Sequence, residues 1–340
     1  MSAPEGAAGR AVLDRLSTSL ALKALLAVAA AIVVLTVPAW AGDYWTRILT
    51  GVCMWAGLAL AWNIIGGYAG YISFGHAAFF GIGAYATALL MQPERHWSFF
   101  LTLPVGAAAA AAVAAVVGWP TLKLRGAYFA IATWAMAEAL LQLATVVDFT
   151  GGSSGLTIPV FASSAFFYYA MLLAAVLSYA ISYLLLERSR FGYKVKAARD
   201  DEATARSMGI DTTRVKIQAF VLSAVIPAVF GGINAYWITF INPRSVLGAE
   251  VTDQMVVMAL VGGLGHAWGP ALGAAALYGV NRQFLAWFGD TTSYIAMVGV
   301  LVALVVLFLP DGLVSLSPRA RRMRLVRRLI PRPRSGTGRR

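Results

Sequence analysis

The chain is poor in charged and reactive side chains. Only 12% of its 340 residues are charged, and it has three histidines and a single cysteine, Cys53. Soluble domains carry about 25% charged residues, so this composition excludes an ordinary soluble protein. One cysteine excludes an internal disulfide bond, and the sequence has no cysteine–histidine cluster of the kind that holds a metal ion.

Motifs of catalysis and nucleotide binding are also absent from the sequence. There is no G-x-x-x-x-G-K-[ST] phosphate loop, no nucleophile elbow and no H-E-x-x-H helix. No pair of acidic residues stands at catalytic spacing within an apolar segment. We therefore predict that the chain is not an enzyme, holds no metal or cofactor, and does not bind ATP through a phosphate loop.

Long apolar segments dominate what is present. Hydrophobic residues make up 59% of the chain, enough for about ten spans of ~20 residues. The sequence predicts an all-α integral membrane protein with about ten transmembrane helices, in a range of eight to ten. The predicted spans are residues 20–37, 47–65, 66–90, 99–118, 127–147, 163–186, 217–240, 254–264, 270–288 and 294–309. The eighth is short for one crossing, because its eleven residues rise only about 16 Å as a helix.

Basic residues predict the orientation. Ten spans place both chain ends on one side, and the basic residues of the two ends, the 119–126 turn and the segment 187–216 then all lie in the cytoplasm. The loops 148–161 and 242–253 are expected outside. The net charge of +12 reflects tails and loops, since ten arginines follow Ser317.

The chain is expected to have three parts. They are a cytoplasmic tail over residues 1–19, a transmembrane domain over 20–310, and a basic cytoplasmic tail over 311–340 that would contact anionic lipid rather than nucleic acid. An alternative for the first apolar segment is a cleavable signal peptide, because Lys23 and Ala39-Trp40-Ala41 flank it.

Two glycine-broken segments, residues 66–85 and 262–279, resemble each other. Each opens with Gly-Gly and contains a Gly-His dipeptide. Paired breaks of this kind mark translocation pathways, although glycine also allows plain close packing of helices. The two histidines are expected to be hydrogen-bonded polar groups rather than ligands. The candidate pathway residues here are Gly66, Gly67, Gly70, Ser73, Gly75, His76, Gly262, Gly263, Gly265 and His266.

A carboxyl group stands near the middle of the fifth predicted span. An ionisable residue at that depth is a functional candidate, so Glu138 is a further candidate pathway residue. It could contact a substrate ammonium, be protonated, or bond to another helix. Asn63, Gln142 and Asn234 also lie within predicted spans, and we expect them to form hydrogen bonds between helices.

Residues 187–216 form a charged island that holds 13 of the chain's 42 formal charges. A helix is predicted over residues 194–208, supported by the i,i+4 pairs Lys196–Asp200 and Glu202–Arg206. Gly209 is placed to end it, and Asp211, Thr212 and Thr213 offer N-cap oxygens for the next helix. Its thin apolar stripe comprises Val195, Ala198, Ala205 and Met208. The island is either a solvated connector or a docking helix for a soluble subunit.

Five stretches carry a family resemblance. They are NIIGGYAGYISFGHAAFFGIGAY (63–85), LRGAYFAIATWAMAEAL (124–140), FTGGSSGLTIP (149–159), FGYKVKAARDDEATARSMGID (191–211) and MALVGGLGHAWGPALGAA (258–275). In this order they resemble the M-type inner-membrane permease of branched-chain amino-acid ABC importers, within a wider group that includes ribose permeases. The resemblance covers residues 56–312.

The resemblance implies a half-transporter in the bacterial inner membrane. It would pair with a second, homologous permease, bind two ATPase subunits that hydrolyse ATP, and receive substrate from an extracytoplasmic binding protein, for which the loop 150–159 is a candidate contact. The island resembles the family's coupling loop, although Thr204 replaces a usual alanine. The residues that would couple to the ATPase are Lys196, Arg199, Glu202, Ala203, Arg206 and Gly209.

The substrate implied by the resemblance is a branched-chain amino acid. Sister systems with similar permeases carry urea, short-chain amides or aromatic acids, so these remain alternatives. An ion-coupled secondary transporter is an alternative of another class, but it needs charged relays in the spans and only Glu138 qualifies.

Overall fold

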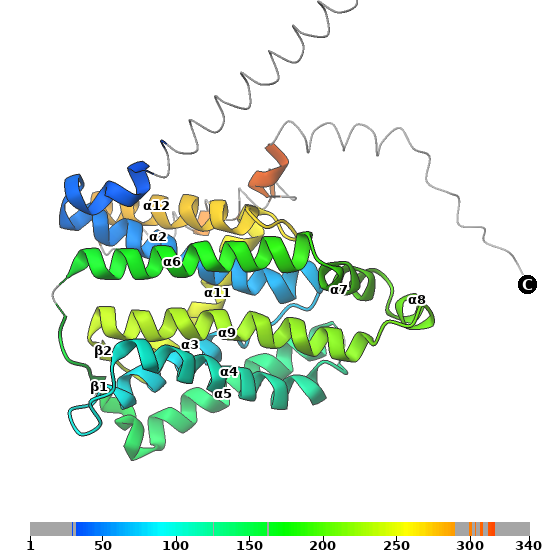
Figure 1. Ribbon diagram of the computed structural model, residues 1–340, viewed down its shortest axis with the longest axis horizontal. Coiled ribbons are helices and arrows are strands. Elements are labelled where there is room, and N and C mark those ends of the chain that lie inside the picture. The colour runs from blue at the N-terminus through cyan, green and yellow to red at the C-terminus, as the bar shows by residue number, and fades with distance from the viewer. Residues whose placement is uncertain are drawn as a thin grey trace, which may run out of the picture.

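The computed structural model describes residues 29, 32–124, 126–161, 163–289, 299–300, 303, 307–308 and 312–316. Within them the chain is a bundle of long helices that lie along one common axis (Figure 1). The predicted tail over 1–19, most of the tail over 311–340, and most of the first and last predicted spans lie outside the described residues.

Helices account for nearly all of the described elements. The helices are α2 (Gly42–Asn63), α3 (His76–Leu90), α4 (Phe99–Thr121), α5 (Ala127–Val146), α6 (Ser164–Ile181), α7 (Arg190–Asp200), α8 (Glu202–Ser207), α9 (Thr212–Ile238), α10 (Pro243–Leu247), α11 (Ala249–Gly262) and α12 (Gly269–Phe288). Two π-helical turns, η1 (Ile64–Tyr68) and η4 (Ser182–Glu187), extend α2 and α6. The strands β1 (Leu156–Thr157) and β2 (Phe240–Ile241) pair antiparallel.

Six described helical segments are long and apolar enough to cross a membrane, which makes this an integral membrane protein. They are Gly42–Tyr68, Phe99–Thr121, Ala127–Val146, Ser164–Glu187, Thr212–Ile238 and Pro243–Gly262. The helix α3 is apolar but has only 15 residues. The total of about ten spans therefore stays a prediction.

The helix α9 lies at the centre of the bundle and packs against α3 and α4 (Figure 1). Glycines bring α3 and α9 into backbone contact, since a Cβ on Gly83 or Gly231 would overlap the other helix. Small residues allow such close crossings in membrane proteins. Most of α2 and α9 is buried, whereas α4, α5 and α6 expose apolar side chains as lipid-facing or partner-facing helices do.

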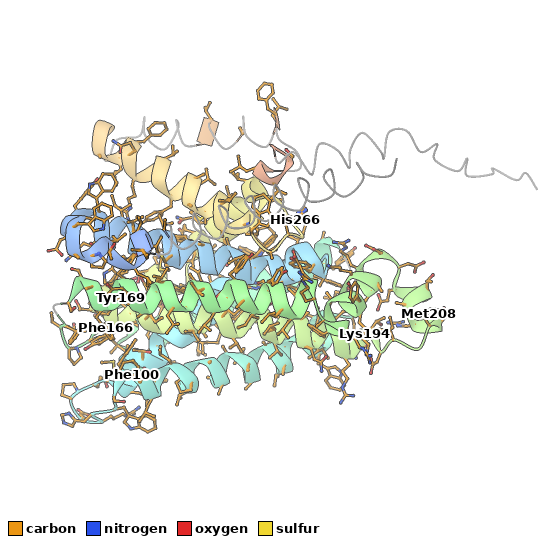
Figure 2. All side chains as sticks on the ribbon, turned by 45° about the horizontal axis from the view of Figure 1, so that its top comes forward. Phe100, Phe166, Tyr169, Lys194, Met208 and His266 are labelled. Atoms are coloured by element: carbon orange, nitrogen blue, oxygen red, sulfur yellow. The ribbon has the colours of Figure 1, made fainter. Side chains whose placement is uncertain are left out.

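The two ends of the bundle differ in character. One end, here called the island end, carries α7 and α8, which project beyond the long helices with Lys194 and Met208 (Figures 1 and 2). The opposite end, the sheet end, carries β1 and β2 and the labelled aromatic residues Phe100, Phe166 and Tyr169. The helix α2 runs from the sheet end to the island end, and α12 runs back.

The prediction of a loop at 242–253 is wrong, because this stretch is helical, whereas its placement outside the membrane stays a prediction. Asn242 and Ser245 form a capping box and Pro243 occupies the first turn of α10. The helix α11 follows after Gly248. Together they make a segment of 20 residues, about 30 Å long, so the eighth span is of normal length and not an eleven-residue stub.

The predicted single helix over 194–208 is also wrong. Asp201 adopts an extended conformation (φ −153°, ψ 109°) and divides the segment into α7 and α8. Its carboxylate accepts hydrogen bonds from the backbone N–H groups of Ala203 and Thr204, so it caps α8. Met208, predicted on the apolar stripe, is 79% exposed because the shorter α8 ends before it.

Candidate coupling site at the island end

The chain leaves regular helix between α2 and α3. After the wide turn η1, residues 69–75 form an irregular segment, here called break one, in which Gly70 has a φ of +76°. Protein groups satisfy its backbone: Phe74 N–H donates to Thr133 Oγ1 (3.1 Å), and the Ser73 carbonyl accepts from Trp62 Nε1 (2.7 Å). Such pairing is what allows irregular backbone at membrane depth.

A second irregular segment, break two, spans residues 263–268 between α11 and α12. Gly263 and Gly265 both have positive φ. Asn63, buried at the end of α2, accepts from Gly265 N–H (2.9 Å) and donates to the His266 carbonyl (3.1 Å). A Cβ on Gly67 would stand 2.6 Å from the Gly265 nitrogen. The end of α2 and η1, the turn directly before break one, are therefore in contact with break two.

One carboxylate joins both segments. Glu187 Oε1, at the end of η4, accepts from Tyr68 Oη (2.9 Å) in the turn before break one and from Ala267 N–H (2.8 Å) in break two. Sequence reasoning did not single out Glu187, because its partners are 119 and 80 residues away. Its position at the start of the charged island was the only available signal.

Arg199 ties α7 to η1, the turn before break one. Its Nη1 donates to the Gly67 carbonyl (3.0 Å), while Nε and Nη2 bond Asp200 Oδ1. The predicted Lys196–Asp200 pair does not form, since Asp200 bonds its neighbour; the Lys196 ammonium instead lies 5.3 Å from the centre of the Tyr68 ring. The predicted island residues thus reach the glycine segments directly.

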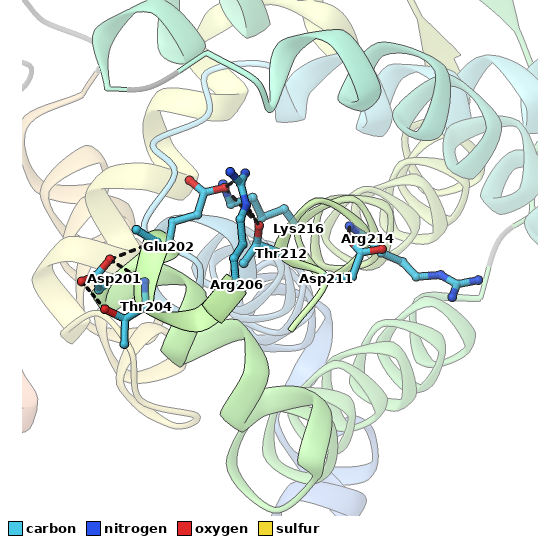
Figure 3. A network of polar contacts seen from close by, with 9 residues as sticks. Asp201, Glu202, Thr204, Arg206, Asp211, Thr212, Arg214 and Lys216 are labelled. Carbon is cyan, nitrogen blue, oxygen red and sulfur yellow. Dashed lines mark hydrogen bonds and ion pairs between the residues drawn. The ribbon is translucent and has the colours of Figure 1, made fainter. Parts of the chain in front are cut away.

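A second polar network fastens α8 to α9 (Figure 3). Glu202 Oε1 pairs with Arg206 (2.6 Å) as predicted, and with Lys216 (2.6 Å), which sequence analysis did not single out. Thr212 Oγ1 donates to the same oxygen (3.2 Å) and accepts from Arg206 Nε (2.9 Å). Lys216 is almost fully buried, and its ammonium lies 4.9 Å from the centre of the Tyr71 ring in break one.

The electrostatics of this network favour the ionised carboxylate. Partial burial would raise the pKa of Glu202, but the hydrogen bond and charge of Lys216, with help from Thr212 and Arg206, outweigh it and leave the pKa below its ordinary value. The bonds from Thr204 and Ala203 likewise lower the pKa of Asp201. Both acids at the α7–α8 joint are thus held charged.

A groove of about 720 Å³ lies between break one, the start of α5 and the α7–α8 joint. Its walls combine apolar and charged groups. The lining residues are Ala69, Gly70, Tyr71, Ile72, Phe74, Gly126, Ala127, Ala130, Ala198, Arg199, Asp200, Asp201 and Glu202. Movement of α7 relative to break one would change this opening.

The remaining predicted coupling residues lie at the tip. Ala203 and Gly209 are exposed, and Gly209 has the positive φ (+80°) expected of a residue that ends a helix. Asp211 caps α9 through Arg214 N–H (3.0 Å), as predicted. No atom lies within 4 Å of a Cβ built on Gly209, so this surface is open to a partner.

Both histidines have hydrogen-bonding neighbours. His76 is buried, with its ring nitrogens 3.2 Å from Ser73 Oγ and from Ser223 Oγ of α9. His266 is exposed and its Nδ1 lies 3.0 Å from the Leu264 carbonyl. The described residues contain no group of three or more histidine, cysteine or acidic side chains placed to hold a metal ion.

The other predicted glycines are contact positions. A Cβ would overlap Trp62 at Gly66, Arg199 at Gly70, and Thr133 at Gly75. At Gly262 it would overlap the backbone of Gly269. The absence of a side chain at these glycines therefore allows Trp62, Arg199, Thr133 and the Gly269 backbone to pack against the main chain in and beside the breaks.

Glu138 does not join this site. It is half-buried on α5, and its carboxylate accepts from Gln142 Nε2 (2.7 Å) on the same helix. Thr133, one turn earlier, is the α5 residue that bonds break one. Within the described residues Gln142 bonds its own helix and not another one, contrary to the prediction. Asn63 bonds the backbone of break two, between α11 and α12, and not a neighbouring helix.

The family follows from comparison with known proteins. A family model described as "Branched-chain amino acid transport system / permease component" matches residues 44–309, more than three quarters of the chain. The chain belongs to this family. The match includes α2 to α12, and hence both breaks and the island that connects to them.

Individual relatives agree with this assignment. The high-affinity branched-chain amino acid transport system permease protein LivM of Salmonella typhimurium is 30% identical over 76% of this chain and 67% of its own length. The LivH permease protein of the same organism is 24% identical over 76% and 90%. The autoinducer 2 import system permease protein LsrC of Salmonella paratyphi B is 27% identical over 59% and 60%. No solved structure matches the chain.

Proposed function

We propose that this chain is a permease subunit of an ATP-driven importer and forms half of the translocation pathway for branched-chain amino acids. The family match over residues 44–309 carries the proposal. The geometry supports it, because the charged island is bonded to η1, the turn before break one, through Arg199 and Glu187, and to break two through Glu187. A solvated connector with no partner protein would not require these hydrogen bonds to the glycine segments.

The substrate class rests on the relatives' names. Similarity to LivM and LivH favours leucine, isoleucine or valine. The similarity to LsrC means that the fold serves other cargo as well. Urea, short-chain amides and aromatic acids therefore remain the alternative substrates.

Partners and orientation complete the proposal. The chain pairs with a second homologous permease, and α7–α8 dock on ATPase subunits that bind and hydrolyse ATP. An extracytoplasmic binding protein delivers substrate at the sheet end. The island end and both termini lie in the cytoplasm of a bacterium, which is supported by the gathering of cations there (Lys123, Arg188, Arg190, Lys194, Lys196, Arg199, Arg206, Arg214 and Lys216).

The mechanism follows from the contacts. ATP-driven closure of the ATPases displaces α8 through its exposed tip, Ala203 to Gly209. The displacement reaches break one through Arg199 and break two through Glu187. The breaks rearrange, and the pathway switches the side to which it opens. The alternative, a stand-alone ion-coupled carrier, finds less support because Glu138 bonds Gln142 and no relay from it reaches the breaks within the described residues.

The test is a charge reversal at the two arginines of the coupling segment. In proteoliposomes with the partner subunits, R199E with R206E should keep ATP hydrolysis but lose ATP-driven leucine uptake. The matched control is R190E with K194E, which makes the same charge change on exposed residues of α7.

The controls separate the possible outcomes. The control variant should transport, and both variants should co-purify with the ATPases. Normal uptake by R199E/R206E overturns the coupling role. Uptake of leucine by the chain alone, without ATP, overturns the importer assignment.

A further inference from the structure

A second groove, of about 430 Å³, lies at the sheet end between α2, α12 and the end of α9. The proposed coupling mechanism does not use it. Two guanidinium groups line it, Arg47 and Arg282, together with Tyr44, Trp237, Tyr278 and Leu285. None of its lining residues in the described part of the chain is acidic, so its two guanidinium charges have no acidic counterpart among them.

Contacts between α2 and α12 hold the two arginines at one place. Arg282 Nε donates to Tyr278 Oη (3.0 Å), and its guanidinium lies 5.1 Å from the centre of that ring. The Tyr278 ring in turn lies against Gly51, where a Cβ would overlap it. Gly51 is one helical turn from Arg47. Arg282 is thus fixed beside the turn of α2 that carries the other guanidinium.

Both guanidiniums keep donors available for a ligand. The structure gives Arg47 no hydrogen-bond or ion-pair partner within its described residues, and Arg282 uses its Nε alone. Two planar guanidinium groups that line one groove together with a tyrosine hydroxyl offer donors suited to the oxygen atoms of a phosphate group.

The position of the groove along the membrane normal favours a lipid as its ligand. Tyr44 and Trp45 are exposed in the first turn of α2, and Trp40 is exposed at the end of the helical residues 32–40 that precede it. Exposed tryptophan and tyrosine of this kind mark the membrane–water interface, where phospholipid headgroups lie. Ile48 and Leu285 provide apolar walls next to the cations, where acyl chains would continue into the bilayer.

We infer that this groove binds the phosphate of a membrane phospholipid, with preference for an anionic headgroup such as phosphatidylglycerol. The two arginines hold the phosphate and the apolar walls hold the start of the acyl chains. An amino-acid substrate fits less well, because no carboxylate lines the groove to receive its ammonium. The inference does not depend on the importer function.

The experiment is a titration of the delipidated, purified protein in detergent with palmitoyl-oleoyl phosphatidylglycerol, followed by native mass spectrometry. The variant R47Q/R282Q should bind the lipid at least about tenfold more weakly, because two charge-assisted bonds are lost. The variant R47K/R282K should recover part of the binding. The control R95Q/R244Q removes two exposed arginines of the sheet end outside the groove and should bind normally.

Competitors identify the ligand group. Palmitoyl-oleoyl glycerol, which lacks the phosphate, should not bind, and neither 10 mM inorganic phosphate nor leucine should displace the lipid. Equal binding by R47Q/R282Q overturns the inference, and so does loss of binding in R95Q/R244Q alone. Displacement by inorganic phosphate would assign the groove to a free anion, and displacement by leucine would assign it to substrate; both contradict a lipid site.

Discussion

Glu187 accepts hydrogen bonds from two segments that lie far apart in the sequence. Tyr68 belongs to the turn before break one and Ala267 to break two. A single side chain that joins two irregular segments constrains both at once. Its position directly before α7 gives the island access to both.

Two replacements of Glu187 should therefore distinguish the effect of its hydrogen-bond acceptor from the effect of its negative charge. Glu187→Ala leaves two polar groups without an acceptor, at a cost of about 1–3 kcal/mol, and should lower ATP-driven leucine uptake at least about tenfold. Glu187→Gln retains the accepting oxygen and should keep most of the uptake. Glu250→Ala, at an exposed acid of the sheet end, is the control for removing one negative charge. Equal loss in the Gln and Ala variants would contradict the bridging role.

Glu202 makes stability depend on pH. Its folded-state pKa lies below the ordinary value of 4.5, so the carboxylate stabilises the fold above about pH 4.5 and this contribution is lost as pH falls through the folded-state pKa. At pH 7 Glu202→Gln should cost about 3 kcal/mol, because buried Lys216 keeps its charge without a counter-ion.

Thermal unfolding in detergent measures this effect. The difference in Tm between the wild type and Glu202→Gln should be largest near pH 7 and should shrink below pH 4.5. A difference that stays constant from pH 7 to pH 4 would exclude Glu202 as the titrating group.

Local residue patterns predicted some of these roles. The Glu202–Arg206 pair, the positive φ of Gly209 and the cap at Asp211 all follow from spacing along one helix or turn. Lys216 and Glu187 could not be predicted in the same way. Their partners lie on other elements, and a single sequence does not reveal which elements meet.

At the scale of elements, most helix bounds agree with the apolar runs, and the errors have physical causes. The stretch 242–253 lies between two apolar runs and was predicted as a loop, but Asn242 caps a helix there through its capping box with Ser245. Residues 194–208 contain no glycine or proline that would stop a helix, yet Asp201 divides them. A carboxylate that caps the following turn competes with helix continuation.

Contact between η1 and break two can be tested at Gly67. Gly67→Ala would place a Cβ against Asn63 and the Gly265 backbone and force η1 and break two apart. Gly279→Ala is the matched control, because it adds the same methyl group in α12 where no atom lies within 4 Å. Gly67→Ala should lower leucine uptake at least about tenfold and lower Tm, since overpacking costs about 1–3 kcal/mol.

Gly279→Ala should be neutral or stabilising by up to about 1 kcal/mol, because alanine favours helix. Uptake and thermal unfolding of both variants measure the effect. Similar behaviour of the two would mean that the breaks tolerate separation.

At the scale of the whole molecule, the described bundle presents two polar side chains, Glu138 and Gln142, on the exposed helix α5. Trp134, Ala135, Glu138, Ala139 and Gln142 follow one another on the open face of α5. A charged group facing lipid at mid-depth costs about 2.5–3.5 kcal/mol, so this face requires a protein or water-filled neighbour. The alanines allow a helix to approach closely. We expect the second permease there.

Cross-linking tests this arrangement. With Cys53 replaced by serine, Ala139→Cys should form a cross-link to the second permease subunit when a short bis-maleimide is added to membranes. Val176→Cys, exposed on α6 instead, is the control and should give none. A cross-link from the α6 position alone would place the partner on the other side of the bundle.

The extended joint at Asp201 has a mechanical consequence. It divides the projecting segment into two short rods that are anchored differently: α7 to Gly67 through Arg199, and α8 to Lys216 through Glu202. A force applied at Met208 is therefore not transmitted through one continuous helix. It divides at Asp201: α7 transmits part of it through Arg199 to Gly67, and α8 transmits the rest through Glu202 to α9. If the Asp201 joint were rigid, α7 and α8 would move as one body. The flexibility of this joint therefore determines how a displacement of the tip is divided between the two contacts.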